Sequence, residues 1–241
     1  MIVNVDAKYL DWLSAVYLSN DQVGKEEIWK GSDLHTDNQK QFNLSSRLIA
    51  KVFLFRIIFG GTAYSFSLDP EFADNNFSVD EWEEVINKFY LKYKGVQAWH
   101  NELISKASKG IIIKIPTGRS WEYRMERDHR GELKLPIPKI KNYPVQGLEA
   151  DLMMLARIPL YQRVKKLCDV LIVNTVHDSL MFDVHEDYVE KIINIIKEVF
   201  RSVPEFFEYY FKVPFDLPFR GEISVGNTWG DLKFVDTTHT F

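Results

Sequence analysis

The sequence has little cysteine, glycine and proline, and each shortage excludes a class of protein. Cys168 is the one cysteine among 241 residues, which excludes an internal disulfide framework and a cysteine-based zinc site. Twelve glycines and nine prolines exclude collagen-like and low-complexity chains. Together these shortages predict a folded protein for a reducing, intracellular setting.

Long hydrophobic runs and an excess of one charge are absent as well. The most apolar stretch, residues 48–59, carries Lys51 and Arg56, whereas a membrane-spanning helix needs roughly 20 mainly apolar residues. The first residues lack the basic region of a secretory signal and soon reach a carboxylate at Asp6. The 30 basic and 34 acidic residues give a net charge of −4, so the overall field does not indicate a nucleic-acid partner. We therefore expect no membrane partner and no secretory leader.

The order of the predicted elements indicates an α+β fold. Hydrophobic residues make up 46% of the chain, enough to bury the core of one large domain or two small ones. Short strands are predicted at residues 2–5, 110–125 (as a pair), 170–176, 180–184 and 221–225. Helices are predicted at 8–19, from a cap at Asn43 or Ser45 to Phe59, at 78–108, at 147–166 with a kink at Pro159, and at 187–200. Because residues 20–109 are almost entirely helical, we predict a mixed antiparallel sheet with a helical insertion.

Local charge differs from the total charge between residues 105 and 141. This segment holds ten basic and four acidic residues. A basic stripe on an otherwise acidic chain could contact phosphates. A solvated hairpin with scattered ion pairs accounts for the same pattern, and the sequence does not decide between the two.

The predicted helix that ends at Phe59 carries an unusual combination of side chains on one face. Arg47, Lys51, Phe55 and Phe59 follow one another at four-residue spacing, which places them on the same side of a helix. The cationic end would suit a triphosphate, and the aromatic end a base or a sugar. The alternative is an ordinary amphipathic helix whose cations extend to solvent.

Two aspartates, Asp6 and Asp178, follow β-rich runs at residues 2–5 and 170–176. If these strands are neighbours, the two carboxylates converge. Paired carboxylates with backbone oxygens and water form the hard-oxygen site that Mg²⁺ prefers, and two such ions support phosphoryl transfer. The alternative is two ordinary turn or capping aspartates. Motifs for other chemistry, H-E-x-x-H, the P-loop and G-x-S-x-G, are absent from the sequence.

Taken together, these residues resemble the conserved motifs of family A DNA polymerases, especially the phage branch. The run from Val3 to Asp11 (V-N-V-D-A-K-Y-L-D) resembles motif A, and Arg47-x-x-x-Lys51-x-x-x-Phe55-x-x-x-Phe59-Gly60 resembles motif B. Residues 176–178 (V-H-D) resemble motif C. Three further segments are similar to family segments in the same order: residues 33–36 (D-L-H-T), 117–119 (T-G-R) and 142–151 (N-Y-P-V-Q-G-L-E-A-D).

The resemblance implies a role for each matched residue. Asp6 and Asp178 would hold two Mg²⁺ ions, for which Mn²⁺ could substitute, with the Ala7 carbonyl as a further ligand. The incoming dNTP would be bound by His35, Arg47, Lys51, Phe55 and Phe59, with Lys51 also a proton donor and Phe59 near the templating base. Primer–template DNA would be contacted by Arg119, Asn142, Gln146 and His177.

The sequence departs from the family pattern at several of these positions. The sugar-gate glutamate is matched by Asp11, which is one methylene shorter, so the resemblance leaves ribonucleotide exclusion open. Phe59 stands where the family has tyrosine, Ser179 where an acidic residue often follows motif C, and Pro138 where the family has arginine. The two main metal ligands are retained despite these changes.

The resemblance also implies a division of the chain into subdomains. We expect residues 1–20 to belong to the palm with motif A, 21–109 to the helical fingers with motif B, and 110–241 to the fingers–palm junction and the palm with motif C. The family has a thumb upstream of motif A, so we expect a split polymerase with an upstream partner polypeptide, or a truncated gene product. The implied setting is the cytoplasm of a phage-infected bacterial cell.

Two other functions remain open at this point. The chain could be an inactive remnant that binds nucleotide or nucleic acid without turnover, although Asp6, Lys51 and Asp178 are all intact. It could also resemble a single-subunit RNA polymerase, which shares the two aspartates. Asp11 at the gate position and the segment around Gln146 favour the DNA polymerase.

Overall fold

The computed structural model describes residues 1–128 and 130–239 and contains two compact units. Unit 1 comprises Met1–Leu10 and Leu148–Phe241, and unit 2 comprises Asp11–Gly147. The helix α8, Ile137–Val164, passes from unit 2 into unit 1. Within the described residues, no helix is both long and apolar enough to span a membrane.

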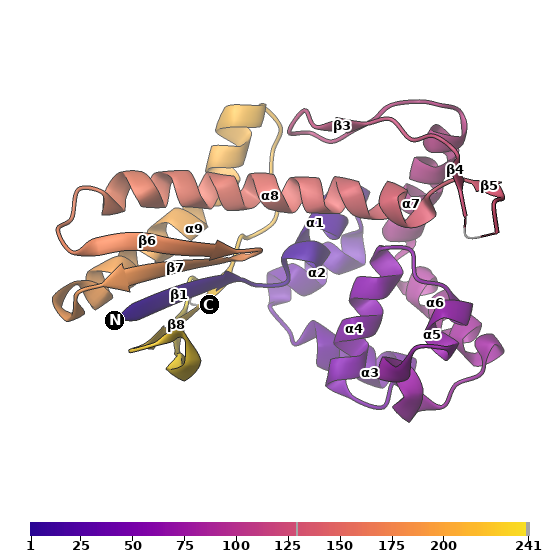
Figure 1. The fold of residues 1–241 in the computed structure, drawn as a ribbon, viewed down its shortest axis with the longest axis horizontal. Coiled ribbons are helices and arrows are strands. Elements are labelled where there is room, and N and C mark those ends of the chain that lie inside the picture. Colours follow the sequence, from indigo (N-terminus) through magenta and orange to yellow (C-terminus); the bar gives the residue numbers. More distant parts are fainter. Residues whose placement is uncertain (129, 240–241) are drawn as a thin grey trace. The chain divides into compact units, whose positions relative to one another are not determined.

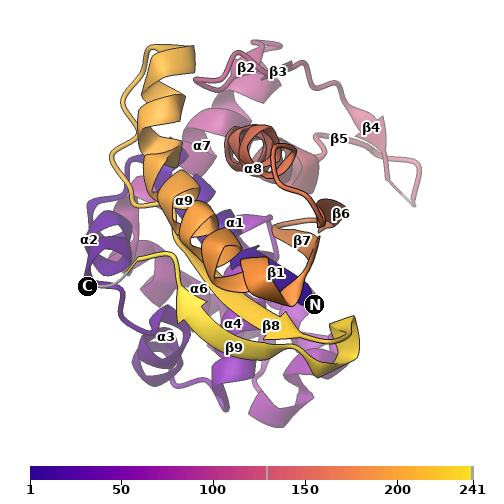
Figure 2. The ribbon, with the colours of Figure 1, turned by 90° about the vertical axis from the view of Figure 1, so that its left-hand side faces the viewer.

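Unit 1 is built on an antiparallel sheet whose strands come from distant parts of the chain. The strands are β1 (Ile2–Ala7), β6 (Val170–Val176), β7 (Ser179–Val184), β8 (Gly221–Gly226) and β9 (Lys233–Thr237). They lie in the order β6-β7-β1-β8-β9, and every neighbouring pair is antiparallel (Figures 1 and 2). The predicted antiparallel sheet is therefore confirmed, and β9 is an additional strand that the sequence pattern did not predict.

One face of this sheet is covered by the long helix α9, Val189–Phe211 (Figure 2). Val3 and Val5 of β1 are completely buried, and the ring of Phe200 from α9 reaches the same face. A Cβ atom placed on Gly221 of β8 would lie 2.7 Å from that ring, so only glycine leaves room for it. Because side chains alternate along a strand, Asn4 and Asp6 point to the opposite face.

Unit 2 is mainly helical. Its helices are α1 (Leu10–Ser19), α2 (Gln22–Lys30), α3 (Leu34–Phe42), α4 (Arg47–Ile58), α5 (Ala63–Ser67), α6 (Val79–Lys92) and α7 (Lys94–Ser108), with a 3₁₀ helix η1 at Pro70–Asn75. Two small hairpins follow: β2 (Ile113–Lys114) with β3 (Ser120–Trp121), and β4 (Glu126–Arg127) with β5 (Leu133–Lys134). The predicted helical insertion is thus present.

Aromatic rings form the core of unit 2. Phe42, Phe53, Phe66, Trp82 and Phe89 are all at most 1% exposed and come from four different helices. Their ring centroids lie 5.3–6.2 Å apart in the contacting pairs, mostly in edge-to-face or tilted arrangements. Such rings bury a large apolar area, and their preferred edge-to-face geometry adds an orientation-dependent stabilisation. This core fixes α4 against α3, α5 and α6.

Several predicted boundaries are wrong, and capping side chains explain two of them. The N-cap of α4 is Ser46, whose hydroxyl accepts from the amide of Ile49, rather than Asn43 or Ser45. Residues 20–43, for which no helix bounds were predicted, form α2 and α3 behind the caps Asp21 and Asp33. A carboxylate that accepts from the first free amides can start a helix whose composition is otherwise polar.

Other boundaries move because tertiary contacts outweigh local signals. The predicted helix 78–108 is interrupted at Tyr93, where the Asp21 carboxylate accepts from the amide of Gly95 at 2.7 Å. The helix predicted from residue 147 begins ten residues earlier, at Ile137, and continues past Pro144 and Pro159. The helix predicted at 187–200 begins at Val189 and extends to Phe211.

Candidate active site

The end of β1 and the turn between β6 and β7 are joined by a backbone hydrogen bond. The amide of Ala7 donates to the carbonyl oxygen of Asp178 at 2.8 Å. The turn consists of His177 and Asp178, and His177 adopts a left-handed φ of +50°. The structure therefore places the backbones of Asp6 and Asp178 next to each other at one end of the sheet.

The sequence predicted that Asp6 and Asp178 would converge if the strands that precede them were direct neighbours, and the structure brings them together in a different way. The strand that leads to Asp178, β6, is not the neighbour of β1, because β7 lies between them. The pairing of Asp6 with Ser179, the first residue of β7, brings the hairpin turn to the end of β1. Convergence thus depends on the register of β7 with β1, which the sequence alone did not specify.

A third carboxylate lies beside Asp6 in the sheet. Glu222 of β8 is paired directly with Asp6, so both side chains leave the sheet on the face that α9 does not cover. Lys8 lies 3.1 Å from the Glu222 carboxylate and partly neutralises it. Sequence reasoning missed Glu222, because only the strand register reveals that it faces Asp6.

The donor set at this end of the sheet suits a hard divalent cation. Asp6 and Asp178 could supply carboxylate oxygens, and Ala7 is the last residue of β1. Among residues 1–128 and 130–239, no cluster of three or more His, Cys, Asp or Glu side chains is close enough to hold a metal ion by itself. An ion here would therefore complete its coordination with backbone oxygen, water or substrate phosphate, as Mg²⁺ commonly does.

In unit 2, α3 brings a histidine to the cationic face of α4. The His35 side chain is buried, and its ring centroid lies 6.3 Å from that of Phe55. The Lys51 ammonium lies 5.7 Å from the same Phe55 ring. Three residues predicted to bind one nucleotide therefore gather around the middle of α4.

The first turn of α4 is tied to α3 by an ion pair. Arg47 Nε donates to Asp33 Oδ2 at 2.7 Å, and Asp33 also accepts from the hydroxyl of Thr36 at 2.8 Å. The hydrogen bond from Arg47 is the main reason why the pKa of Asp33 lies well below its usual range, with the bonds from Thr36 in the same direction and burial opposing them. Asp33 therefore stays ionised and orients the guanidinium. Sequence reasoning did not identify this pairing, which depends on the contact between α3 and α4.

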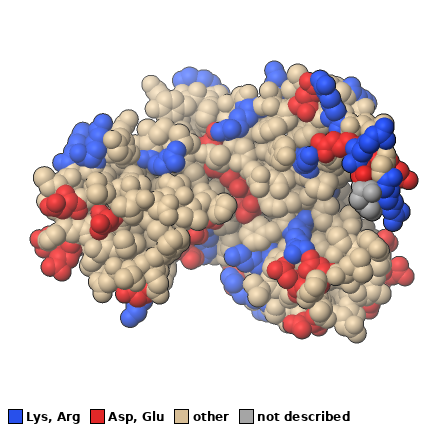
Figure 3. All heavy atoms as spheres, viewed as in Figure 1, with Lys and Arg blue, Asp and Glu red and all other residues tan. Residues whose placement is uncertain are grey.

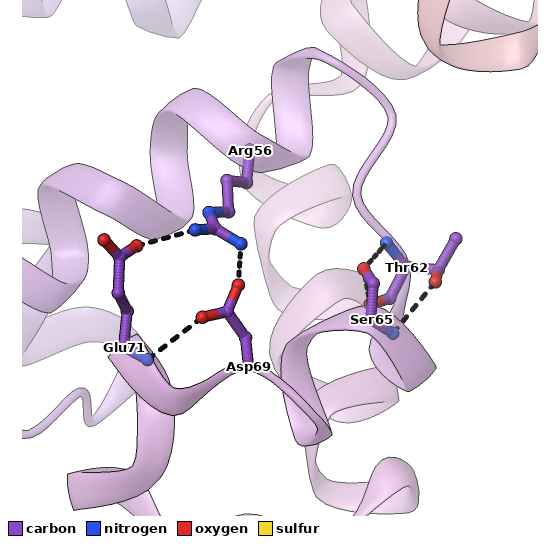
Figure 4. Close-up of polar contacts among 5 residues, drawn as sticks. All are labelled: Arg56, Thr62, Ser65, Asp69 and Glu71. Atoms are coloured by element: carbon purple, nitrogen blue, oxygen red, sulfur yellow. Dashed lines mark hydrogen bonds and ion pairs between the residues drawn. The ribbon is translucent and has the colours of Figure 1, made fainter.

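The opposite side of α4 is held by a different ion pair (Figure 4). Arg56 makes a bidentate contact with Asp69 and Glu71, and the Glu71 amide donates to Asp69 Oδ1 at 3.0 Å. Nearby, Thr62 and Ser65 cap each other at the start of α5. Arg56 is thus engaged in structural ion pairs. We therefore do not count it with Arg47 and Lys51 among the predicted nucleotide-binding residues.

The predicted DNA-contact residues of unit 2 lie near the start of α8. Asn142 and Gln146 are one helical turn apart on α8. A Cβ atom on Gly147 would lie 3.3 Å from Arg119 Cδ, so the β2–β3 hairpin brings Arg119 to the same part of the helix. Within the described residues, the buried side-chain oxygen of Asn142 has no hydrogen-bond partner.

The predicted site residues are divided between the two units. Unit 1 holds Asp6, Ala7, His177 and Asp178. Unit 2 holds Asp11 in the first turn of α1, Phe59 at the C-cap of α4, and His35, Arg47, Lys51, Phe55, Arg119, Asn142 and Gln146. The structure therefore defines two groups of residues, each with its own internal geometry.

The basic segment 105–141 is partly neutralised by its own acidic residues. Lys134 lies 2.9 Å from Asp128, and Lys139 lies 2.7 Å from Glu126. The bond from Lys134 lowers the pKa of Asp128 to about 2. Basic and acidic side chains alternate around β4 and β5 (Figure 3). The β4–β5 hairpin therefore fits the alternative of a solvated, ion-paired hairpin better than that of an uninterrupted phosphate-binding stripe.

Comparison with known proteins places the chain in a family. The sequence model described as DNA polymerase family A matches residues 2–231, so the chain belongs to that family. The thermostable DNA polymerase I of Thermus filiformis is 25% identical over 242 residues, which cover 97% of this chain and 27% of that protein. The DNA polymerase of Bacillus phage SP01 is 25% identical over 195 residues, 80% of this chain and 21% of that protein.

A solved structure has the same fold. The polymerase domain of Pol1 from M. smegmatis, in complex with DNA primer-template and dNTP, superposes with a TM-score of 0.76 at 19% identity. The match covers 96% of this chain and 40% of that one. The chain thus spans about a quarter of the length of the curated relatives named above. The family and the α+β fold inferred from the sequence motifs are confirmed.

Proposed function

We propose that this chain is the catalytic portion of a template-directed DNA polymerase, which transfers a nucleotide from a dNTP to a primer 3′-hydroxyl. The observation that carries the proposal is the hydrogen bond from Ala7 to Asp178, which holds two motif carboxylates at one sheet end in a family A chain. The open face of the sheet, on which Asp6 lies, gives these groups access to a large substrate.

Asp6 and Asp178 would hold the divalent ions, Mg²⁺ or Mn²⁺ in its place, with the Ala7 carbonyl as a further ligand. Two such ions supply Lewis-acid activation of the attacking hydroxyl and charge stabilisation of the departing pyrophosphate. The protein's own part would be to hold the two aspartates side by side, and the register of β1 with β7 supports this because it brings their backbones together.

Unit 2 would bind the incoming nucleotide along α4. Arg47 and Lys51 would attract the triphosphate, with His35 as a further donor, and Lys51 would protonate the leaving pyrophosphate. Phe55 would lie against the sugar, and Phe59 near the templating base. Asp33 has a supporting role, because its ion pair holds Arg47 in place before the nucleotide arrives.

The remaining site residues would contact the primer–template and discriminate the sugar. Asn142, Gln146 and His177 would reach the minor groove or the primer end, where all correct base pairs present nearly equivalent acceptors. Arg119, which lies beside Gly147, would contact a phosphate. Asp11 would take the place of the family's sugar gate.

We further propose that residues 1–20 and 110–241 contribute the palm and its junction, and residues 21–109 the fingers. A partner polypeptide would supply the thumb in the cytoplasm of a phage-infected bacterium. Exposed apolar side chains in unit 1 are what a docking partner would cover: Ile158 and Tyr161 of α8 are 46% and 57% exposed, and Leu171 and Val173 of β6 are 63% and 50% exposed.

Primer extension with Mg²⁺ and dNTPs tests this function, with and without the upstream polypeptide. We expect extension by the complex and its loss in Asp178→Asn. Asp183→Asn is the matched control, because Asp183 is an exposed aspartate of the neighbouring strand. Binding of dNTP without incorporation would instead indicate a nucleotide-binding remnant, and preferential use of rNTPs an RNA polymerase.

A further inference from the structure

Three polar side chains meet inside unit 2, behind the end of α4. Tyr90 of α6 lies with its hydroxyl 3.1 Å from Nδ1 of His100 on α7. The ammonium of Lys141, on α8, lies 3.5 Å from the same hydroxyl, at the long end of the hydrogen-bonding range. His100 is 2% exposed and Lys141 is 9% exposed. The nucleotide-binding role proposed above makes no use of these groups.

The chemistry of the three groups gives the chain of hydrogen bonds a direction. Lysine can only donate, so Lys141 donates to the Tyr90 oxygen. Burial raises the pKa of Tyr90 to about 12, so the phenol keeps its proton and donates it to His100 Nδ1. Burial, and to a smaller extent the charge of Lys141, holds the pKa of His100 well below its usual value. His100 is therefore neutral at pH 7, with its remaining proton on Nε2.

The last link of the chain points to the backbone of α4. Nε2 of His100 is buried and makes no hydrogen bond of standard geometry with the described residues. The backbone of Ile58 is close enough to raise the pKa of His100, against the larger lowering effects of burial and of Lys141. Ile58 is the last residue of α4. The hydrogen-bonded chain thus runs from Lys141 through Tyr90 to His100, which lies beside this helix end.

The end of α4 is a tight corner against the start of α8. The amides of Gly60 and Gly61 donate hydrogen bonds to the carbonyls of Ile57 and Arg56. The carbonyl of Ile58 is then the next one at the helix end that can accept a hydrogen bond. Gly60 has φ +94°, and a Cβ atom there would lie 3.3 Å from Pro138 Cα and 3.5 Å from Lys141 Cδ. The stem of Lys141 therefore packs on the corner while its ammonium enters the polar chain.

The stability of the fold does not explain why residue 141 is a lysine. The structure pairs Lys141 with no carboxylate among the described residues, and burial lowers its pKa. An unpaired buried cation usually costs stability that an apolar side chain of similar length would not. Lys141 also directly precedes Asn142, the first proposed DNA contact on α8. These facts indicate that Lys141 positions the neighbouring elements rather than stabilising the fold.

We propose that Lys141, Tyr90 and His100 are positioning residues, which fix the Phe59–Gly60 corner of α4 against the start of α8. These hydrogen bonds would keep the nucleotide-binding face of α4 in register with the Asn142–Gln146 segment. This consequence rests on the function proposed above. None of the three residues is assigned a contact with the substrate. Their loss should therefore weaken productive nucleotide binding more than it slows the chemical step.

The kinetic test compares Lys141→Met with Lys139→Met in the complete polymerase complex. Lys139 is two residues away on the same helix, but it is exposed and ion-paired with Glu126. We expect Lys141→Met to raise the KM for dNTP by about tenfold and to change kcat by less than about twofold. Lys141→Arg, which keeps a donor, should restore most of the loss, and Lys139→Met should leave both constants unchanged. An unaltered KM in Lys141→Met would overturn the proposal.

Amide hydrogen exchange tests the same proposal without an activity measurement. In Lys141→Met, the amides of Gly60 and Gly61 should exchange faster, while those of β1 and β7 in unit 1 keep their rates. The melting temperature should not fall, because the variant removes a buried charge. If the wild-type complex fails to extend primers but exchange at the corner rises, the function fails and the positioning role stands. If exchange at Gly60 and Gly61 is unchanged, the positioning role is wrong whatever the activity.

Discussion

The amide of Ala7 donates a 2.8 Å hydrogen bond to the carbonyl of Asp178, although the two residues lie 171 positions apart in the sequence. This bond closes the ladder between β1 and β7 at the end where both motif carboxylates stand. A backbone bond in a sheet is independent of side-chain rotamers and pH. The relation between Asp6 and Asp178 is therefore a property of the fold, available before any ligand binds.

The first prediction separates the motif carboxylate Asp6 from Glu222, its neighbour on β8. Asp6→Asn should reduce primer extension by about a thousandfold or more, because the ion site loses a charged ligand. Glu222→Gln should reduce it by less than about threefold, since Glu222 is already paired with Lys8. Single-turnover rates at saturating Mg²⁺ measure both. Equal losses in the two variants would contradict the assignment of Asp6 as a ligand and Glu222 as a bystander.

The second prediction concerns Asp21, which caps two helices at once. Its carboxylate accepts from the amide of Gly24 in α2 at 2.9 Å and from those of Gly95 and Val96 in α7. Asp21→Ala leaves these amides without the acceptor, and we expect the free energy of unfolding to fall by about 2–4 kcal/mol. Urea denaturation measures the change. Asp80→Ala, at an exposed position in the first turn of α6, should cost less than about 1 kcal/mol.

The third prediction is a pH dependence that follows from Asp33. Its pKa is held below the usual range, chiefly by the hydrogen bond from Arg47, so ionised Asp33 stabilises the folded state. This contribution is fully present above the unfolded pKa of about 4 and is lost as the pH falls through the lower folded value. Because both side chains are about half exposed, the contribution should be below about 1 kcal/mol.

The measurement compares the stability of Asp33→Asn with that of the wild type between pH 7 and pH 2. The difference should be largest at neutral pH and should shrink steadily below about pH 4. A difference that grows as the solution is acidified would show that the sign of the effect is wrong. Asp37→Asn, on the same helix, serves as the control.

The fourth prediction tests the packing of α9 on the sheet. A methyl group on Gly221 would meet the Phe200 ring at 2.7 Å and the Asp6 carbonyl oxygen at 3.0 Å. Gly221→Ala should therefore destabilise the protein by about 1–3 kcal/mol and shift the end of β1. Gly230→Ala, whose nearest neighbour would be 3.9 Å away, should be nearly neutral. Thermal unfolding of both variants checks the prediction.

The sequence predicted the parts of the fold in which local pattern and tertiary packing agree. Helical spacing predicted a helix over residues 78–108, and its apolar residues Trp82, Val85 and Phe89, which recur at three- and four-residue spacing, are buried. Four-residue spacing likewise predicted that Lys51 and Phe55 share a face, and they lie in contact. In these cases a short-range signal is sufficient, because the periodicity of a helix is the same wherever it packs.

Features that depend on long-range pairing could not be predicted in the same way. Nothing local indicates that β7 rather than β6 lies beside β1, or that Glu222 faces Asp6. The cap at Ser46 was missed because several small polar residues compete there, and backbone geometry selects one of them. Strand β9 was missed because its exposed side chains carry no alternating pattern.

Localised backbone cleavage by Fe²⁺, bound in place of Mg²⁺, tests most directly whether Asp6 and Asp178 form one ion site. In the presence of ascorbate and peroxide, a single bound ion should cut the chain at two places, around residues 6–8 and around residues 177–179. Excess Mg²⁺ should suppress both cuts together, and Asp6→Asn should abolish both. Cleavage at only one of the two places, or loss of one cut without the other in Asp6→Asn, would contradict a shared site.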